Sequence, residues 1–194
     1  MNARKSLLSI AVLVAMSGAA VADNGTVNTT QDGARNALTV DQSFATGSKT
    51  TINQVGTQNR SDVEQTGRRN TASVNQASGA AATDDVQQAA KLNQGGRDNT
   101  ASIYQEGTTA NKVTATINQG LNGGSYNTAG INQVAGRGNA QALINQGGEN
   151  NTGLINQNKT IAGSATLTQG GISNTGTINQ YDSYMGESVK LTQT

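Results

Sequence analysis

The sequence predicts an all-β fold, a β-solenoid of about seven stacked strand–arc–strand units whose strands form two facing, parallel, in-register sheets. Three periodic features predict it. A Gln recurs mostly every 11 to 14 residues, a bulky aliphatic stands two residues before nearly every such Gln, and Gly often follows two residues after it. No apolar stripe recurs at the three- and four-residue spacing of a helix. A fixed repeat of this kind is typical of a stacked architecture.

The strands follow from the step of two, because alternate residues of a strand lie on one face. In QGGRDNTASIYQ, residues 94–105, steps of two place Asn, Ala, Ile and Gln on one face, and Thr, Ser and Tyr104 on the other. The first face carries the regular pattern in unit after unit, so we expect it to be buried. One unit has a single aliphatic per strand, which means that only stacking can bury it.

Burying so many amides needs an explanation, since each unsatisfied polar group costs about 1–3 kcal/mol. In a stack, each carboxamide can donate to one neighbour and accept from the other, as in amide ladders. The alternative, in which Asn and Gln cap the arcs by bonding to the arc backbone, fits the sequence equally well, and both arrangements can coexist. We favour ladders, formed by Gln31, Asn36, Gln42, Gln54, Asn59, Gln65, Asn70, Gln76, Gln94, Asn99, Gln105, Gln119, Asn127, Gln133, Gln146, Asn151, Gln157, Gln169, Asn174, Gln180 and Gln193.

Short connectors such as QTGRRN and QGGENN separate the strands. Gly stands where a tight arc needs a positive φ without a Cβ. The predicted arc glycines are Gly33, Gly56, Gly67, Gly96, Gly107, Gly148 and Gly171.

The N-terminus predicts export. Residues 1–22 combine a basic start at Arg4 and Lys5, a short apolar run and an Ala-Val-Ala end, which is the pattern of a secretory signal peptide. Residues 23–26 form a short N-terminal segment, and residues 27–194 form the repeat solenoid. The apolar run is too short to span a membrane, so we expect a mature chain without a transmembrane segment.

Composition argues against catalysis and against nucleic-acid binding. The sequence has no His, no Cys and no Pro, and eleven basic against twelve acidic residues remain after residue 22. A Ser or Thr nucleophile needs a base, and the scattered carboxylates supply no catalytic pair. Near-neutrality gives no electrostatic reason for nucleic acid to bind. We therefore expect no catalytic, cofactor-binding or metal-binding residues and no cofactor.

Two segments, residues 65–76 (QTGRRNTASVNQ) and 94–105 (QGGRDNTASIYQ), resemble the curlin repeat of bacterial curli fibre subunits. The resemblance extends over nearly the whole mature chain. It implies a subunit of a secreted functional amyloid that assembles extracellularly on a Gram-negative-type cell and serves biofilm matrix, surface adhesion and cell aggregation. It also implies partners: copies of itself, a second curlin subunit, an outer-membrane secretion pore and periplasmic accessory proteins. The family's long Gly-rich segment after the signal peptide is barely represented by residues 23–26, and the roles of major subunit and nucleator both stay open.

Two further expectations concern the ends and the outer face. The ends of an open solenoid are templates for another copy, so we expect head-to-tail cross-β stacking. The alternative is a monomeric secreted solenoid that binds ice or glycans through its outer face, although the outward pairs look too mixed for this. In the last unit, Glu187 stands where the pattern expects Asn, and Val189 stands where it expects a small residue. This change is either the sequence drift of a terminal repeat or the mark of an end that controls growth or anchors the fibre. Outward charges are the expected gatekeepers against premature pairing: Asp62, Glu64, Arg68, Arg69, Asp84 and Asp85.

Overall fold

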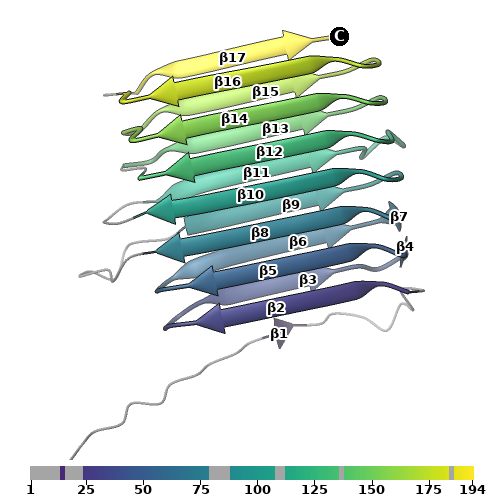
Figure 1. The fold of residues 1–194 in the computed structure, drawn as a ribbon, viewed down its shortest axis with the longest axis horizontal. Coiled ribbons are helices and arrows are strands. Elements are labelled where there is room, and N and C mark those ends of the chain that lie inside the picture. The colour runs from purple at the N-terminus through teal and green to yellow at the C-terminus, as the bar shows by residue number, and fades with distance from the viewer. Residues whose placement is uncertain (1–13, 16–23, 79–87, 108–111, 136–137, 184–185) are drawn as a thin grey trace, which may run out of the picture.

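The computed structural model describes residues 14–15, 24–78, 88–107, 112–135, 138–183 and 186–194. Within these ranges the chain is all β, with no helix. Most of the predicted signal peptide lies outside the described residues, as do Asp84 and Asp85. The predicted all-β solenoid is confirmed (Figure 1).

Two parallel sheets face each other along the whole solenoid. Sheet 1 contains, in spatial order, β2 (Thr26–Asp32), β5 (Lys49–Val55), β8 (Thr71–Ser78), β10 (Thr100–Gly107), β12 (Thr128–Val134), β14 (Thr152–Asn158) and β16 (Thr175–Tyr181). Sheet 2 contains β1 (Val14–Ala15), β3 (Ala37–Asp41), β6 (Asn59–Gln65), β9 (Gln88–Gln94), β11 (Val113–Gln119), β13 (Gln141–Gln146), β15 (Ser164–Gln169) and β17 (Ser188–Gln193). Two short strands in the arcs, β4 (Ala45–Thr46) and β7 (Gly67–Arg68), pair with each other.

The chain alternates between the sheets, so each turn adds one strand to sheet 1 and one to sheet 2. Neighbouring turns are in register, which places Gln105 beside Gln76 on one side and Gln133 on the other. Ile103 likewise lies between Val74 and Ile131. The repeat seen in the sequence is therefore a repeat in space, one turn over the next.

A narrow core fills the space between the sheets. It consists of the aliphatic and small residues of the inward face, among them Ile103, Ile117 and Ala101, each at most 1% exposed. The end turns are less covered: Val27 and Leu191 are only partly buried. No turn has a core without its neighbours, because each strand contributes only one to three apolar side chains to it.

The arcs contain two left-handed positions. The predicted Gly33, Gly56, Gly67, Gly96, Gly148 and Gly171 all have positive φ. The second left-handed residue immediately precedes each inward Asn and is usually not Gly: it is Arg35, Gln58, Arg69, Asp98, Tyr126, Asn150 or Ser173. The sequence pattern does not predict this second position.

Gly107 is a correction to the predicted arc glycines. It is the last residue of β10, where it pairs with Ser78 of β8. The strand continues two residues past Gln105 here, so Gly107 lies in the strand and not in an arc.

Candidate functional site: glutamine ladders and open ends

A continuous glutamine ladder runs through sheet 1. Each Nε2 donates to the Oε1 of the Gln one turn later, at 2.6 to 2.9 Å. All rungs except Gln31 are at least 95% buried. The rungs are Gln31, Gln54, Gln76, Gln105, Gln133, Gln157 and Gln180.

Sheet 2 contains a second ladder of the same kind, with Nε2 to Oε1 distances of 2.7 to 3.0 Å. Its rungs are Gln42, Gln65, Gln94, Gln119, Gln146, Gln169 and Gln193. The second N–H of most rungs donates to a backbone carbonyl of the opposite sheet, as Gln119 does to Thr100 at 3.1 Å. The carboxamides thus join neighbouring turns and also join the two sheets.

Both ladders have one direction. Every rung donates toward the C-terminal turn and accepts from the N-terminal side. Gln31 and Gln42 are therefore first rungs, with no rung before them to donate to their Oε1 atoms. Gln180 and Gln193 are last rungs, and their Nε2 atoms have no rung after them to accept.

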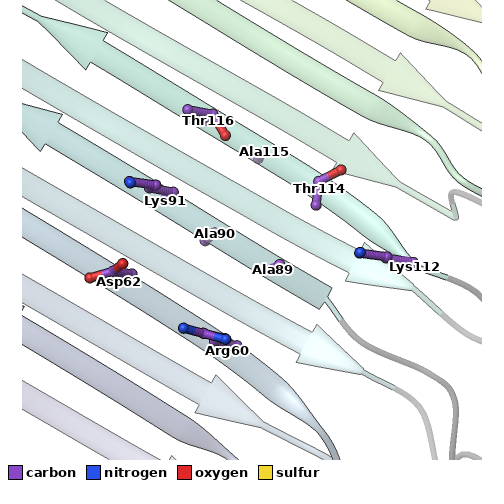
Figure 2. Close-up of a pocket in the computed structure, with 9 residues that line it drawn as sticks. All are labelled: Arg60, Asp62, Ala89, Ala90, Lys91, Lys112, Thr114, Ala115 and Thr116. Carbon is purple, nitrogen blue, oxygen red and sulfur yellow. The ribbon is translucent and has the colours of Figure 1, made fainter.

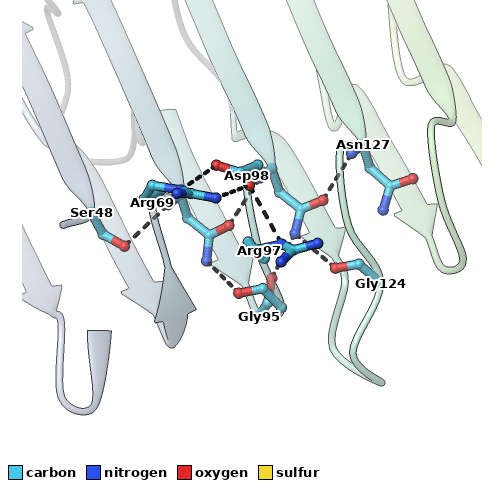
Figure 3. Close-up of polar contacts among 10 residues, drawn as sticks. Ser48, Arg69, Gly95, Arg97, Asp98, Gly124 and Asn127 are labelled. Atoms are coloured by element: carbon cyan, nitrogen blue, oxygen red, sulfur yellow. Dashed lines mark hydrogen bonds and ion pairs between the residues drawn. The ribbon is translucent and has the colours of Figure 1, made fainter. Parts of the chain in front are cut away.

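The inward asparagines act differently, as caps of the arcs (Figure 3). Asn99 Nδ2 donates to the carbonyls of Gly95, at 2.7 Å, and Gly124, at 3.1 Å. Its backbone N–H donates to Asn70 Oδ1 at 3.0 Å, and its own Oδ1 accepts from the backbone N–H of Asn127 at 2.9 Å. The same hydrogen bond, from the backbone N–H of one Asn to the Oδ1 of the Asn one turn before it, links Asn59 to Asn36 on the opposite arcs. It also links Asn151 to Asn127 and Asn174 to Asn151.

The two arrangements considered for the amides are thus both present, divided by residue type. Gln forms side-chain ladders within each sheet, whereas Asn bonds to the arc backbone. Most buried amides are satisfied in one of these two ways, which removes most of the burial cost that the sequence raised. The exceptions among the inward amides of the described residues are Asn59 Oδ1 and Gln88 Oε1, which are buried without a hydrogen-bond partner.

Charged residues gather on the arcs beside Asn70 and Asn99. Arg69 makes a bidentate ion pair with Asp98, at 2.8 and 2.7 Å, and Arg97 Nε lies 3.5 Å from the same carboxylate (Figure 3). The hydrogen bond from Arg69 lowers the pKa of Asp98 below its ordinary value. Arg97 also stacks over the ring of Tyr126, 5.4 Å from its centroid. Arg69, which the sequence suggests as a gatekeeper, therefore joins two turns within one chain.

The outer faces are more regular than the mixed outward pairs of the sequence suggest. On sheet 1, the in-register pairs align five outward Thr residues in one column, and all but the half-buried Thr71 are exposed: Thr71, Thr100, Thr128, Thr152 and Thr175. On sheet 2, Asn93 donates to Asn118 at 2.7 Å and Asn118 donates to Asn145 at 2.8 Å. The signal for the Thr column is a Thr five residues before the Gln, which recurs in the sheet 1 strands and in sheet 2 only at Thr114 of β11. It is lost when the strands of both sheets are compared together.

The ends of the solenoid present strand edges. Among the described residues, β2 and β16 end sheet 1 and β17 ends sheet 2, each with one unpaired side. Thr29, which occupies an inward position in line with Ile52, is exposed at the N-terminal end. At that end, Leu38 and Thr39 of β3 pair with Val14 and Ala15 of β1.

The described residues contain no helix long and apolar enough to cross a membrane. They also contain no group of three or more His, Cys, Asp or Glu side chains placed to hold a metal ion.

Comparison with known proteins gives one match. Residues 48–77 match the family model described as the curlin associated repeat. This segment comprises β5, β6, the arc after it and nearly all of β8. Neither curated proteins nor solved structures give a match. The matched segment is one turn of the solenoid plus the first strand of the next, and this part of the chain is similar to the curlin associated repeat.

Proposed function

We propose that the chain is a structural subunit of a secreted, curli-like functional amyloid fibre, in which copies stack head to tail by cross-β pairing. The fibre would serve biofilm matrix, surface adhesion and cell aggregation outside a Gram-negative-type cell. This is a structural role and not a catalytic one. The partners would be further copies, a second curlin subunit, an outer-membrane secretion pore and periplasmic accessory proteins.

One observation carries the proposal: both ends of the solenoid present open edges that match each other. The last rungs, Gln180 and Gln193, have the donors that the first rungs, Gln31 and Gln42, would accept from. Open edges of this kind are usually protected in monomeric proteins by Pro, inward charges or a covering element. The sequence has no Pro, and the inward residues of β2, β16 and β17 are uncharged.

Removal of a signal peptide during export would change one of these edges, that of β3. We propose that residues 1–22 are removed as a signal peptide, which would take away β1. The edge of β3 would then be free along its whole length, as the edge of β2 already is. In this proposal, the mature chain has two complete open ends.

The test places a charge at the stacking face. Thr29 is exposed in one chain but would be buried against Ile178 of the next copy, since these positions share the column that contains Ile52. Thr29→Lys should therefore leave the single chain folded and stop elongation, because burying an unpaired ammonium costs several kcal/mol. The matched control is Thr30→Lys, which adds the same charge one residue away on the outward face.

Assembly of the mature chain is followed by electron microscopy and fibre diffraction. The wild type and Thr30→Lys should give fibres with a reflection near about 4.7–4.8 Å. Thr29→Lys should give none at concentrations about a hundredfold above the wild-type threshold. Equal fibre formation by both variants, or a wild-type chain that stays monomeric for days, would overturn the proposal.

The second candidate function is a monomeric solenoid that binds ice or glycans, and the Thr column of sheet 1 favours it. Five Thr side chains, all exposed except the half-buried Thr71, lie on successive in-register turns, at a spacing of about 4.8 Å. Replacing Thr128 with Lys would break this array at its centre. A loss of ice or glycan binding in that variant, in a chain that forms no fibres, would support the second candidate.

A further inference from the structure

A hollow on the outer face of sheet 2 gathers positive charge. It has a volume of about 410 Å³ and lies over β6, β9 and β11 (Figure 2). Its floor is formed around Ala89, whose short side chain lies between Arg60 on one strand and Thr114 on the other. The lining side chains that carry the argument are those of Arg60, Asp62, Lys91, Lys112, Thr114 and Thr116.

The charges around the hollow are unbalanced. Arg60, Lys91 and Lys112 face a single lining carboxylate, Asp62, which lies directly across from Lys91. Glu64 follows on the same face of β6, opposite Asn93 and outside the lining. Among the residues that the structure describes, no carboxylate lies within ion-pair distance of the three cations. The hollow therefore offers cationic donors that are free to meet an anion.

We propose that this hollow binds an acidic sugar, with a uronate unit of a polysaccharide as its ligand. The carboxylate of a uronate would accept from the guanidinium of Arg60 and the ammonium groups of Lys91 and Lys112. Asp62 would accept from sugar hydroxyls, and the Thr hydroxyls can donate or accept. Ala89 leaves room and an apolar floor for the C–H face of the ring.

The lining distinguishes this ligand from a nucleic acid. None of the lining residues is aromatic, so there is no platform on which a base could stack. Asp62 would repel a phosphate backbone, whereas a sugar hydroxyl gives it a donor. The combination of cations, one carboxylate, hydroxyls and a small apolar floor fits a polyhydroxylated acid better than a phosphodiester.

The site lies within one chain and does not depend on assembly. If the proposed stacking holds, the seven turns of each copy would repeat the site about every 34 Å along the fibre. A long uronate polymer could then contact several sites at once and bind more tightly than a short one through multivalency.

The experiment uses the full mature chain and a fluorescently labelled trimer of galacturonic acid. Binding is counted per folded chain, in soluble form or in sedimented fibres, with circular dichroism as the measure of folding. Ala89→Leu fills the hollow and keeps every charge, and Arg60→Gln removes one cation. Both should weaken binding roughly tenfold. Ala89→Leu takes the space of the sugar ring, and Arg60→Gln removes a charge-assisted contact. The matched control, Lys190→Gln, removes a cation from β17, outside the hollow but in the outward column that contains Lys91, and should leave binding unchanged.

Three outcomes would overturn the proposal. One is binding that Ala89→Leu leaves intact, because this would show general electrostatic attraction without a site. Another is an equal loss in Lys190→Gln. The third is equal binding of a single-stranded oligonucleotide of the same charge, which would favour a nucleic acid. None of these outcomes bears on fibre formation, which Thr29→Lys tests separately.

Discussion

Replacing Gln105 with Glu perturbs the ladder of sheet 1 without changing the shape of the side chain. Gln105 is fully buried. Its Oε1 accepts from Gln76 at 2.8 Å, and its Nε2 donates to Gln133 at 2.9 Å. An ionised Glu keeps the acceptor but loses the donor, so a buried carboxylate would face the Oε1 of Gln133. A protonated Glu has an O–H that restores the donor.

The cost can be worked out from this geometry. Burial and the facing carbonyl oxygen raise the pKa of the new carboxyl above its unfolded value of about 4.3. Each pH unit above that value costs the folded state about 1.4 kcal/mol until the folded pKa is reached. The variant should therefore lose about 3–4 kcal/mol at pH 7 relative to wild type, if the folded pKa lies at or above 7. Below about pH 4.3 the carboxyl is protonated in both states, and this loss disappears.

Urea unfolding at pH 4 and pH 7 measures this difference. Unfolding is monitored by far-UV circular dichroism, under conditions where light scattering detects no fibres. The matched control is Gln141→Glu, which makes the same change at an exposed position on the outer face of β13. Its stability should stay within about 0.5 kcal/mol of wild type at both pH values. A Gln105→Glu chain as stable as wild type at pH 7, or one equally destabilised at pH 4, would refute the ladder as a source of stability.

Three other predictions concern the arcs and the outer face. Gly96→Ala should cost about 2 kcal/mol or more in thermal unfolding, because φ is +67° and a Cβ would lie 1.9 Å from a backbone oxygen of the next turn; Gly147→Ala, where a Cβ meets nothing within 4 Å, serves as control. Asp98→Asn should make the free energy of unfolding depend less on pH in acid. Arg69 lowers the pKa of Asp98, so the Asp98 carboxylate stabilises the fold above its ordinary pKa, and this stabilisation is lost as the pH falls through the lowered pKa of the folded state. An unchanged dependence of stability on acid pH would count against this. Glu64→Gln should shorten the lag of assembly measured by thioflavin fluorescence, and an unaltered lag would argue against gatekeeping.

The strands and their register follow from local physical rules. A buried strand face demands a period of two, and stacking in parallel repeats each position in the next turn. Gln105, Ile103 and Ala101 could therefore be assigned to one inward face from spacing alone, and the structure aligns them with their counterparts. The side-chain pattern alone sets this register, because a slip by one residue would turn the amides and the aliphatics outward.

The different hydrogen bonding of Gln, in side-chain ladders, and of Asn, to the arc backbone, could not be predicted, because it depends on the backbone conformation of the arcs. Asp98 adopts a left-handed conformation just before Asn99. The carbonyls of Gly95 and Gly124 then lie within reach of the short Asn side chain. Gln, which is longer and lies on a flat strand, reaches along the stack instead. The sequence contains no separate mark for the left-handed position, since Arg, Asp, Tyr, Asn and Ser all occupy it.

The shared direction of the two ladders bears on how copies could join. A single flipped carboxamide would set two donors against each other on one side and two acceptors on the other, so each rung fixes the orientation of the next. At the C-terminal end, Gln180 and Gln193 offer donors, and at the N-terminal end, Gln31 and Gln42 offer acceptors. Two copies that met through the same end would place like groups against each other in both ladders. In the proposed fibre, only the contact of a C-terminal end with an N-terminal end continues both ladders, so the fibre would be polar and its two tips would grow at different rates.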